Sequence, residues 1–182
     1  MSNELIFRAA DSADIEQLIA LGLLAYGQLA SQLSTEGWEQ MKTGIGNTEM
    51  WQDILGKAKG FVCCTGTNDI VGMAFLVPSG NPWGDIYPND WSYIRMVGVH
   101  PEFGGRGIGR KLTQQCIEAA KQSEEHTIAL HTSEVMDAAR HIYEGLGFYV
   151  VREIESRFGI RYWLYRMALT DNDIIVAEAG NT

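Results

Sequence analysis

The sequence is poor in cysteine. Cys63, Cys64 and Cys116 are the only three among 182 residues, an odd count in which two are adjacent. This excludes a disulfide framework that uses every cysteine, and no C-x-x-C pair offers the spacing of zinc ligands. We therefore expect buried thiols that behave as small hydrophobic side chains, and a reducing, cytoplasmic location. Residues 1–8 also lack the basic-then-apolar order of a signal peptide.

Long apolar runs and an excess of positive charge are missing as well. No stretch approaches the roughly 20 apolar residues that a membrane-spanning helix needs, so we expect no membrane partner. The 14 Lys and Arg residues are outnumbered by 23 Asp and Glu residues, which gives a net charge of −9. Such a field repels phosphate and argues against general nucleic-acid binding, whereas it favours cationic substrates such as amines. The four histidines are scattered without ligand spacing, and no metal is expected.

What the chain does have is enough apolar sequence for one sizeable core. Its composition is 46% hydrophobic, and a chain of this length buries roughly 70% of its unfolded surface. No repeat, linker or low-complexity tract interrupts it. We expect a single domain over residues 1–170, followed by a polar tail over 171–182.

The order of elements predicts a mixed α/β sheet flanked by helices, because strands alternate with helices after an early antiparallel hairpin. Strands are expected over 6–7, 61–64, 70–77, 93–99, 127–131, 149–154 and 162–169. Helices are expected over 14–26, 29–42, 50–58, 107–122 and 136–146. The segment 78–90, which holds three of the four prolines, is expected to be a loop.

The most informative segment is a glycine-rich turn between a strand and a helix. The strand ends at Val99, Pro101 prevents its continuation, and glycines at 104, 105, 107 and 109 precede the helix. Such a turn directs backbone N–H groups and the positive end of a helix dipole at one anion. Arg106 and Arg110 would add direct charge. This pattern is typical of a phosphate cradle, although an ordinary glycine-rich turn would read the same way.

Two common nucleotide motifs do not fit this turn. A Walker A loop needs Gly-Lys followed by a hydroxyl residue, and the sequence Gly109-Arg110-Lys111 has none. A Rossmann fingerprint would match Gly105 and Gly107, but Arg110 stands where the third glycine belongs. A nucleotide-binding protein of either kind is therefore disfavoured.

The turn resembles the signature V-x-P-x-x-[RQ]-x-x-G-x-[GA] of the GNAT superfamily of acyl-CoA-dependent N-acetyltransferases. Val99, Pro101, Gly107 and Gly109 match it in register, whereas Gly104 stands where Arg or Gln is usual. A second stretch, residues 139–148, resembles the family's A-x-x-x-Y-x-x-L-G-F element at the expected distance, with Met136 in place of an Asn often found ahead of it.

This resemblance implies the GNAT fold and a cleft for acetyl-CoA between two splayed parallel strands. The backbone of Val97, Gly98 and Val99 would bind the pantetheine arm, and the N–H near Val97 would polarise the thioester carbonyl. Tyr143 would lie near the sulfur and stabilise the leaving thiolate, mainly by a hydrogen bond. The pyrophosphate would be held by the turn, through Gly105, Arg106, Gly107, Ile108, Gly109 and Arg110.

The function implied is acetyl transfer to a primary amine of a small molecule or a peptide. The base is left open among Asp90, Glu134, His131 and a chain of water molecules. A non-catalytic acyl-CoA-binding or sensing domain is the alternative, and homodimer formation is open.

Six aromatic residues fall where this family builds its acceptor pocket and could bind a cation there, although core or lid packing is the commoner role of such residues: Tyr26, Trp38, Trp51, Trp83, Tyr87 and Trp91. Three arginines near the end, Arg157, Arg161 and Arg166, are expected to form a solvated face.

Overall fold

One mixed sheet organises the chain. A computed structural model describes residues 4–170, and its seven strands follow the order β1-β2-β3-β4-β5-β7-β6. Only the β4–β5 pair is parallel. The strands are β1 (Ile6–Ala9), β2 (Lys59–Cys64), β3 (Ile70–Val77), β4 (Ser92–Val99), β5 (Thr127–Ser133), β6 (Tyr149–Arg157) and β7 (Ile160–Ala168). The predicted mixed α/β architecture is confirmed, and the expected tail over 171–182 lies outside the described residues.

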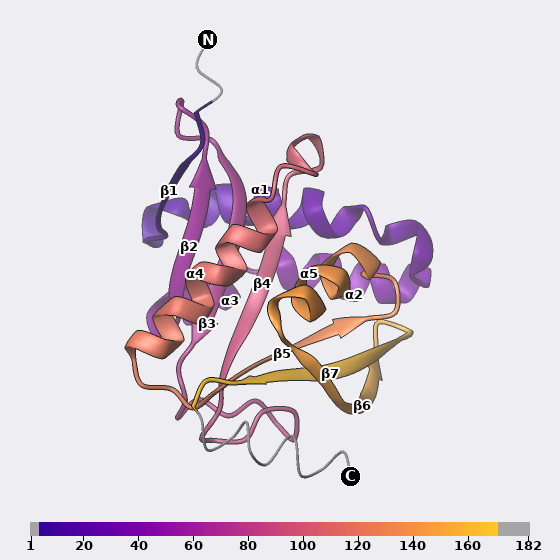
Figure 1. Cartoon of the computed structure of the whole chain (residues 1–182). Helices are drawn as coiled ribbons and strands as arrows, with labels where there is room; N and C mark the ends of the chain where they lie inside the picture. Colours follow the sequence, from indigo (N-terminus) through magenta and orange to yellow (C-terminus); the bar gives the residue numbers. More distant parts are fainter. Residues whose placement is uncertain (1–3, 171–182) are drawn as a thin grey trace.

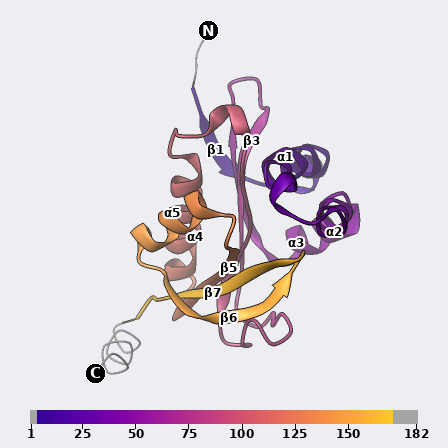
Figure 2. The ribbon, with the colours of Figure 1, turned by 90° about the vertical axis from the view of Figure 1, so that its right-hand side faces the viewer.

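Helices cover both faces of this sheet, as Figure 2 shows. Helices α1 (Ile15–Gly27), α2 (Thr35–Ile45) and α3 (Thr48–Lys57) lie on one face, and α4 (Ile108–Gln122) and α5 (Asp137–Leu146) on the other. Each layer has its own apolar cluster, because β3 is buried on both of its faces. Figure 1 shows α4 running along the centre of the sheet, with α5 beside the β6–β7 hairpin.

The single helix predicted over 29–42 is wrong. The chain instead makes a 3-10 turn at Ala30–Gln32 and then begins α2 at Thr35. The reason is local: Ser34 has an extended backbone, and its Oγ accepts a hydrogen bond from the N–H of Gly37 at 3.0 Å. A side-chain cap of this kind satisfies a donor that the first helical turn leaves free, and so fixes where the helix starts.

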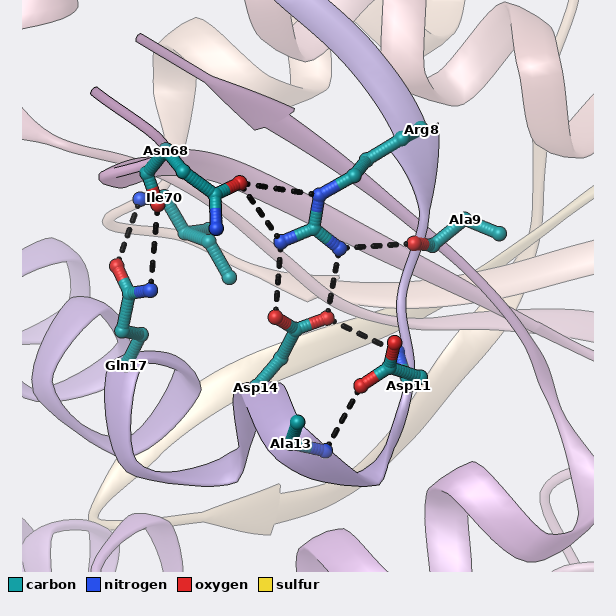
Figure 3. Close-up of polar contacts among 8 residues, drawn as sticks. All are labelled: Arg8, Ala9, Asp11, Ala13, Asp14, Gln17, Asn68 and Ile70. Atoms are coloured by element: carbon teal, nitrogen blue, oxygen red, sulfur yellow. Dashed lines mark hydrogen bonds and ion pairs between the residues drawn. The ribbon is translucent and has the colours of Figure 1, made fainter. Parts of the chain in front are cut away.

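An ion pair ties β1 to the segment that leads into α1 (Figure 3). The guanidinium of Arg8, on β1, donates two hydrogen bonds of 2.8 Å to the carboxylate of Asp14, ahead of α1. That carboxylate also accepts from the N–H of Asp11 at 2.9 Å, and Arg8 reaches Asn68 in the β2–β3 turn. These contacts hold the pKa of Asp14 below its usual range, with the Arg8 hydrogen bonds as the main cause. The pair therefore joins β1, α1 and the β2–β3 turn.

The three thiols lie in the core as expected. Cys63, Cys64 and Cys116 are all buried and free. Burial raises the pKa of each thiol, so they remain protonated at neutral pH. Within residues 4–170, no helix combines the length and the apolar composition needed to cross a bilayer.

Candidate functional site

Strands β4 and β5 separate soon after they start. Their parallel pairing consists of Ser92 with Ile128 and Tyr93 with Ala129. Beyond these pairs, β4 stays bonded to β3 and β5 to β7, so the two strands diverge toward Val99 and Ser133. The sheet is therefore open at its middle, in the part of the structure where α4 and α5 begin (Figure 1).

A bulge shapes the diverging part of β4. Phe75 pairs with Arg95 and Met73 pairs with Gly98, so Ala74 alone faces both Met96 and Val97. Met96 takes a left-handed conformation with φ of +55°, which a non-glycine residue rarely adopts. One extra residue of this kind kinks a strand and changes the direction of its next peptide groups.

The bulge leaves the backbone at Val97 and Gly98 closely surrounded. The C=O of Val97 accepts a hydrogen bond from the phenol of Tyr26, on α1, at 3.3 Å. A Cβ on Gly98 would come within 3.0 Å of the Met73 side chain and 3.3 Å of Ala25. A side chain at 98 would therefore be crowded by Ala25 on α1 and by the end of Met73 on β3.

The glycine turn presents the start of α4 without a side-chain cap. Gly105 and Gly107 both have φ of +75°, and Gly107 is the N-cap of the helix. No heavy atom lies within 4 Å of a Cβ built on either residue, so glycine is needed there for backbone conformation and not for space. The first turn of α4 contains no acidic side chain. Its free N–H groups can therefore donate hydrogen bonds to a bound anion.

A large cleft of about 560 Å³ runs from this turn to α5. The following predicted site residues line it: Val97, Gly98, Val99, Gly105, Gly107, Ile108, Gly109, Arg110 and Tyr143. Gly104 lines it too. Arg106 is not among the lining residues, and its guanidinium lies over the ring of Phe103 at 4.8 Å. The direct charge at this end of the cleft therefore comes from Arg110.

Tyr143 lies at the inner end of the large cleft. It comes from α5, is 6% exposed, and packs edge-on against Phe148 with ring centroids 6.0 Å apart. Burial, with smaller effects from Tyr26 and Cys116, raises the pKa of its phenol above the ordinary value. Tyr143 therefore keeps its proton at neutral pH and can donate a hydrogen bond.

A small cavity of about 270 Å³ adjoins the large cleft. Five residues line both: Tyr26, Val97, Met136, Ala139 and Tyr143. The small cavity extends on the side of α2 and the β6–β7 turn, where Trp83, Phe158 and Tyr162 form aromatic walls. The two spaces thus meet at Val97 and Tyr143, between the diverging strands.

Two arginines that the sequence analysis missed or misplaced also line the small cavity. Arg95 lies on β4 with its guanidinium 4.1 Å from the ring centre of Trp83, and Arg157, at the end of β6, lies 5.2 Å from the same ring. The expectation of a solvated face is therefore wrong for Arg157, although Arg161 is exposed and paired with Glu153. A charged residue inside the otherwise apolar strand over 93–99 was the signal available for Arg95.

Of the three proposed bases, His131 alone lines one of the two spaces. His131 lines the small cavity, but its Nδ1 lies 2.6 Å from the phenol oxygen of Tyr87. Burial, together with Arg157 and Arg95, lowers its pKa to about 3, so it is neutral and weakly basic. The Glu134 carboxylate accepts from the N–H of Arg161, and Asp90 lies near His126, outside both spaces.

The six aromatic residues divide between the site and the core. Tyr26 and Trp83 line the small cavity, and Tyr87 stacks on Tyr93 behind Trp83 with ring centroids 4.0 Å apart. Trp51 is fully buried and donates its indole N–H to the C=O of Ile45 at 2.8 Å. Across residues 4–170, no three His, Cys, Asp or Glu side chains are grouped so that they could hold a metal ion.

Comparison with known proteins gives a family for this arrangement. The sequence profile of the Acetyltransferase (GNAT) family matches residues 28–148. The chain is 32% identical over 66 residues to the L-amino acid N-acyltransferase MnaT of Escherichia coli K12, which covers 35% of this chain and 38% of that protein. It is 33% identical over 90 residues to the N-acetylaspartate synthetase of Danio rerio, covering 42% and 32%. The chain thus aligns with about a third of the length of these relatives.

Solved structures share the fold over nearly the whole chain. The PaiA N-acetyltransferase of Thermoplasma acidophilum, in complex with coenzyme A, superposes with a TM-score of 0.73 at 13% identity, over 91% of this chain and 99% of that one. YncA of Salmonella typhimurium, with acetyl-CoA, gives 0.67 at 19% identity, over 92% and 95%. At such identities the similarity establishes the fold.

Proposed function

The chain belongs to the acetyltransferase (GNAT) family, and we propose that it transfers an acetyl group from acetyl-CoA to the primary amine of a small molecule or a peptide. One observation carries the proposal. The diverging strands join a cleft that ends in a bare helix N-terminus to a separate cavity, and the two meet at Val97 and Tyr143. A thioester and an amine can therefore enter from different sides and meet between the strands.

The large cleft fits acetyl-CoA in its chemistry. Free N–H groups at Gly107, Ile108 and Gly109, with the guanidinium of Arg110, would bind the pyrophosphate. The backbone from Val97 to Val99, which has no strand partner on the β5 side, would hydrogen-bond the pantetheine arm. The names of the structural neighbours, which include complexes with coenzyme A and acetyl-CoA, support this assignment.

The reaction would be direct attack. The neutral amine nitrogen forms a bond to the thioester carbonyl carbon and gives up one proton to water, the C–S bond breaks, and the sulfur leaves as a thiolate that takes a proton from solvent. The N–H near Val97 would polarise the carbonyl oxygen, and Tyr143 would donate a hydrogen bond to the departing sulfur. Because burial raises the pKa of Tyr143, a hydrogen bond fits this phenol better than full proton transfer to a thiolate whose conjugate acid has a pKa near 8.5.

The names of relatives support transfer to nitrogen and leave the acceptor undecided. They include an L-amino acid N-acyltransferase and N-alpha-acetyltransferase RimI of Mycobacterium tuberculosis. The proposal treats residues 1–170 as one cytoplasmic catalytic domain that needs neither a metal nor a nucleic acid.

The test has two parts. Calorimetric titration with acetyl-CoA measures binding, and a thiol reagent measures release of coenzyme A in the presence of a panel of primary amines. We expect binding and amine-dependent release, with the release reduced in Tyr143→Phe. Binding without release for any amine would support the alternative, a non-catalytic acyl-CoA sensor. Displacement of acetyl-CoA by ATP or NAD would contradict the assignment of the large cleft to acetyl-CoA.

A further inference from the structure

We propose that the small cavity selects an acceptor that carries a carboxylate next to its amine, as a free amino acid does, and that Arg95 and Arg157 bind this carboxylate. The proposal rests on the function proposed above and names the substrate class of the same site. It is carried by the placement of two guanidinium groups on one indole ring, in a cavity without acidic side chains among its lining residues.

Neither arginine has an anionic partner in the part of the chain that the structure describes, because no carboxylate of residues 4–170 forms an ion pair with Arg95 or Arg157. The buried Nε of Arg157 has no hydrogen-bond acceptor there. Other arginines do form ion pairs with carboxylates, as Arg161 does with Glu153 at 2.9 Å. A charge withdrawn from water without a partner is destabilising, and two like charges that share one ring repel each other. A bound anion would relieve both costs.

Other charged groups around the cavity do not neutralise these two cations. His131 is uncharged at neutral pH, since burial and the arginines lower its pKa to about 3. Asp53, the carboxylate that acts on Arg95 from a distance, is largely exposed and pairs with Lys57 at 2.7 Å. Burial is the main cause of the lowered pKa of His131, and the positive charges of Arg157 and Arg95 add to it.

The size and position of the cavity favour a small acceptor. Its volume of about 270 Å³ lies below the 300–1,000 Å³ typical of pockets for drug-sized ligands. Arg95 precedes Val97 by two residues and both line this cavity, so a molecule of amino-acid size can reach both the guanidinium and the reacting end of the cavity. Apolar walls at Met41, Phe158 and Tyr162 would suit an apolar side chain.

The experiment compares acceptors that share a side chain and carry a carboxylate, an amide or a hydrogen on the carbon next to the amine, each assayed across pH so that the neutral fraction of the amine is known. L-Phenylalanine, L-phenylalaninamide and phenethylamine form one series, and L-leucine, L-leucinamide and isoamylamine form a second. Coenzyme A release is measured for each with the wild-type chain. We expect kcat/KM for the amino acid to exceed that of its amide and its decarboxylated amine by about tenfold or more, the value of a hydrogen bond to a charged group.

Variants then assign the effect to the two arginines. Arg95→Gln and Arg157→Gln are expected to raise KM for the amino acid by about 10- to 100-fold. KM for the decarboxylated amine should stay within about threefold of its wild-type value. Arg157→Lys should fall between, because lysine keeps the charge and loses the forked geometry. Arg161→Gln, which removes an exposed arginine of the same hairpin, is the matched control and should behave as wild type.

The outcomes separate this inference from the proposed function. Equal use of phenethylamine and L-phenylalanine, or equal losses for both in the arginine variants, would overturn the carboxylate site and leave acetyl transfer standing. If acetyl-CoA binds and no amine is acetylated, the proposed function fails, and calorimetric titration of L-phenylalanine into the protein saturated with coenzyme A decides the inference. Binding that is lost in Arg157→Gln supports the site, and absence of binding to wild type refutes it. Should a variant fail to fold, the wild-type acceptor series decides alone.

Discussion

Gly107 offers a test of where the pyrophosphate binds. It is the N-cap of α4 with φ of +75° and ψ of 12°, and space around its Cβ position is open. Three substitutions separate strain from charge: Gly107→Ala, Gly107→Glu and Gly107→Lys. All three pay the same left-handed backbone strain, about 1–2 kcal/mol of folding free energy. They differ only in what they place at the mouth of the large cleft.

The charge effect should dominate acetyl-CoA binding. A carboxylate about 6 Å from one phosphate charge, at an effective dielectric constant of about 20, costs about 3 kcal/mol, or roughly 100-fold in Kd. We expect Gly107→Ala to weaken binding by no more than about fivefold, since the helix N–H groups remain. Gly107→Glu should weaken it by about 100-fold, whereas Gly107→Lys should bind as well as the alanine variant or better.

The assay is calorimetric titration with acetyl-CoA, with thermal unfolding of each variant measured alongside. A similar loss of thermal stability in all three would establish that they share the strain. If Gly107→Glu and Gly107→Lys then weaken binding equally, the obstruction is steric and the pyrophosphate lies elsewhere. A lysine variant weaker than the glutamate variant would refute the cradle outright.

Three further predictions concern single residues. Tyr143→Phe should lower kcat by about 10- to 100-fold and leave the Kd of acetyl-CoA within about threefold, because the ring still packs on Phe148; an unchanged kcat would remove the phenol from the reaction. Gly104→Arg should tighten acetyl-CoA binding by up to about tenfold, because Gly104 lines the large cleft with an ordinary φ of −60° and its Cβ would only touch the C=O of Pro101 at 3.4 Å; weaker binding would contradict it. Asp14→Asn should lower the free energy of unfolding by about 2–3 kcal/mol, less than for a fully buried pair since Arg8 is 29% exposed. Because the folded pKa of Asp14 is depressed, wild type holds this stability above the unfolded pKa of about 3.9 and loses it as pH falls through the folded value; denaturant titrations of both proteins from neutral to acid pH should converge, and parallel curves would refute the pair's role.

The core elements followed from periodicity because their local signals and their packing agree. The strand over 70–77 reads as continuously apolar, and β3 is indeed buried on both faces. The glycine turn was readable because its chemistry lies within one contiguous segment. The helix prediction over 29–42 was wrong because one capping side chain, Ser34, outweighed the average helix propensity of its neighbours.

Tyr26 and Trp83 were expected near an acceptor pocket and do line the small cavity, but its two arginines were beyond sequence reasoning because distant segments bring them together. Trp83 comes from the loop after β3, Arg95 from β4 and Arg157 from the end of β6. Their meeting depends on the diverging strands and on the bulge at Met96, where tertiary packing imposes a conformation that no local preference of methionine would predict. The lone Arg95 in an apolar strand indicated a polar role at that position, but the sequence did not show that Arg157 would lie beside it.

The same two arginines offer a physical explanation of how the acceptor amine could lose its proton without a strong base in the small cavity. An alkylamine with a pKa of about 10.4 is only about one part in 10³ neutral at pH 7. In the small cavity the cationic groups are Arg95 and Arg157, and the titratable groups near them are neutral: His131 through its lowered pKa, and the phenols of Tyr26, Tyr143 and Tyr162 through raised ones. A substrate carboxylate would cancel one of the two positive charges. The other would disfavour an ammonium group and lower the pKa of the bound amine, as the two arginines, after burial, do for His131.

The pH dependence of kcat tests this, because kcat reports groups in the bound complex. Its rise with pH should be centred below the solution pKa of the acceptor amine. In Arg157→Gln the bound amine keeps its proton more readily, so the rise should move to higher pH. His131→Gln is the matched control, and it should leave the profile unchanged because His131 is already neutral over the range. A step near pH 6–7 that disappears in His131→Gln would instead make that histidine the base.

The net charge of −9 does not enter this balance. Surface carboxylates beyond a Debye length of about 8–10 Å are screened, and a zwitterionic amino acid is not repelled on approach. The two guanidinium groups, and not the acidic surface, would therefore determine which amine is bound and in which protonation state.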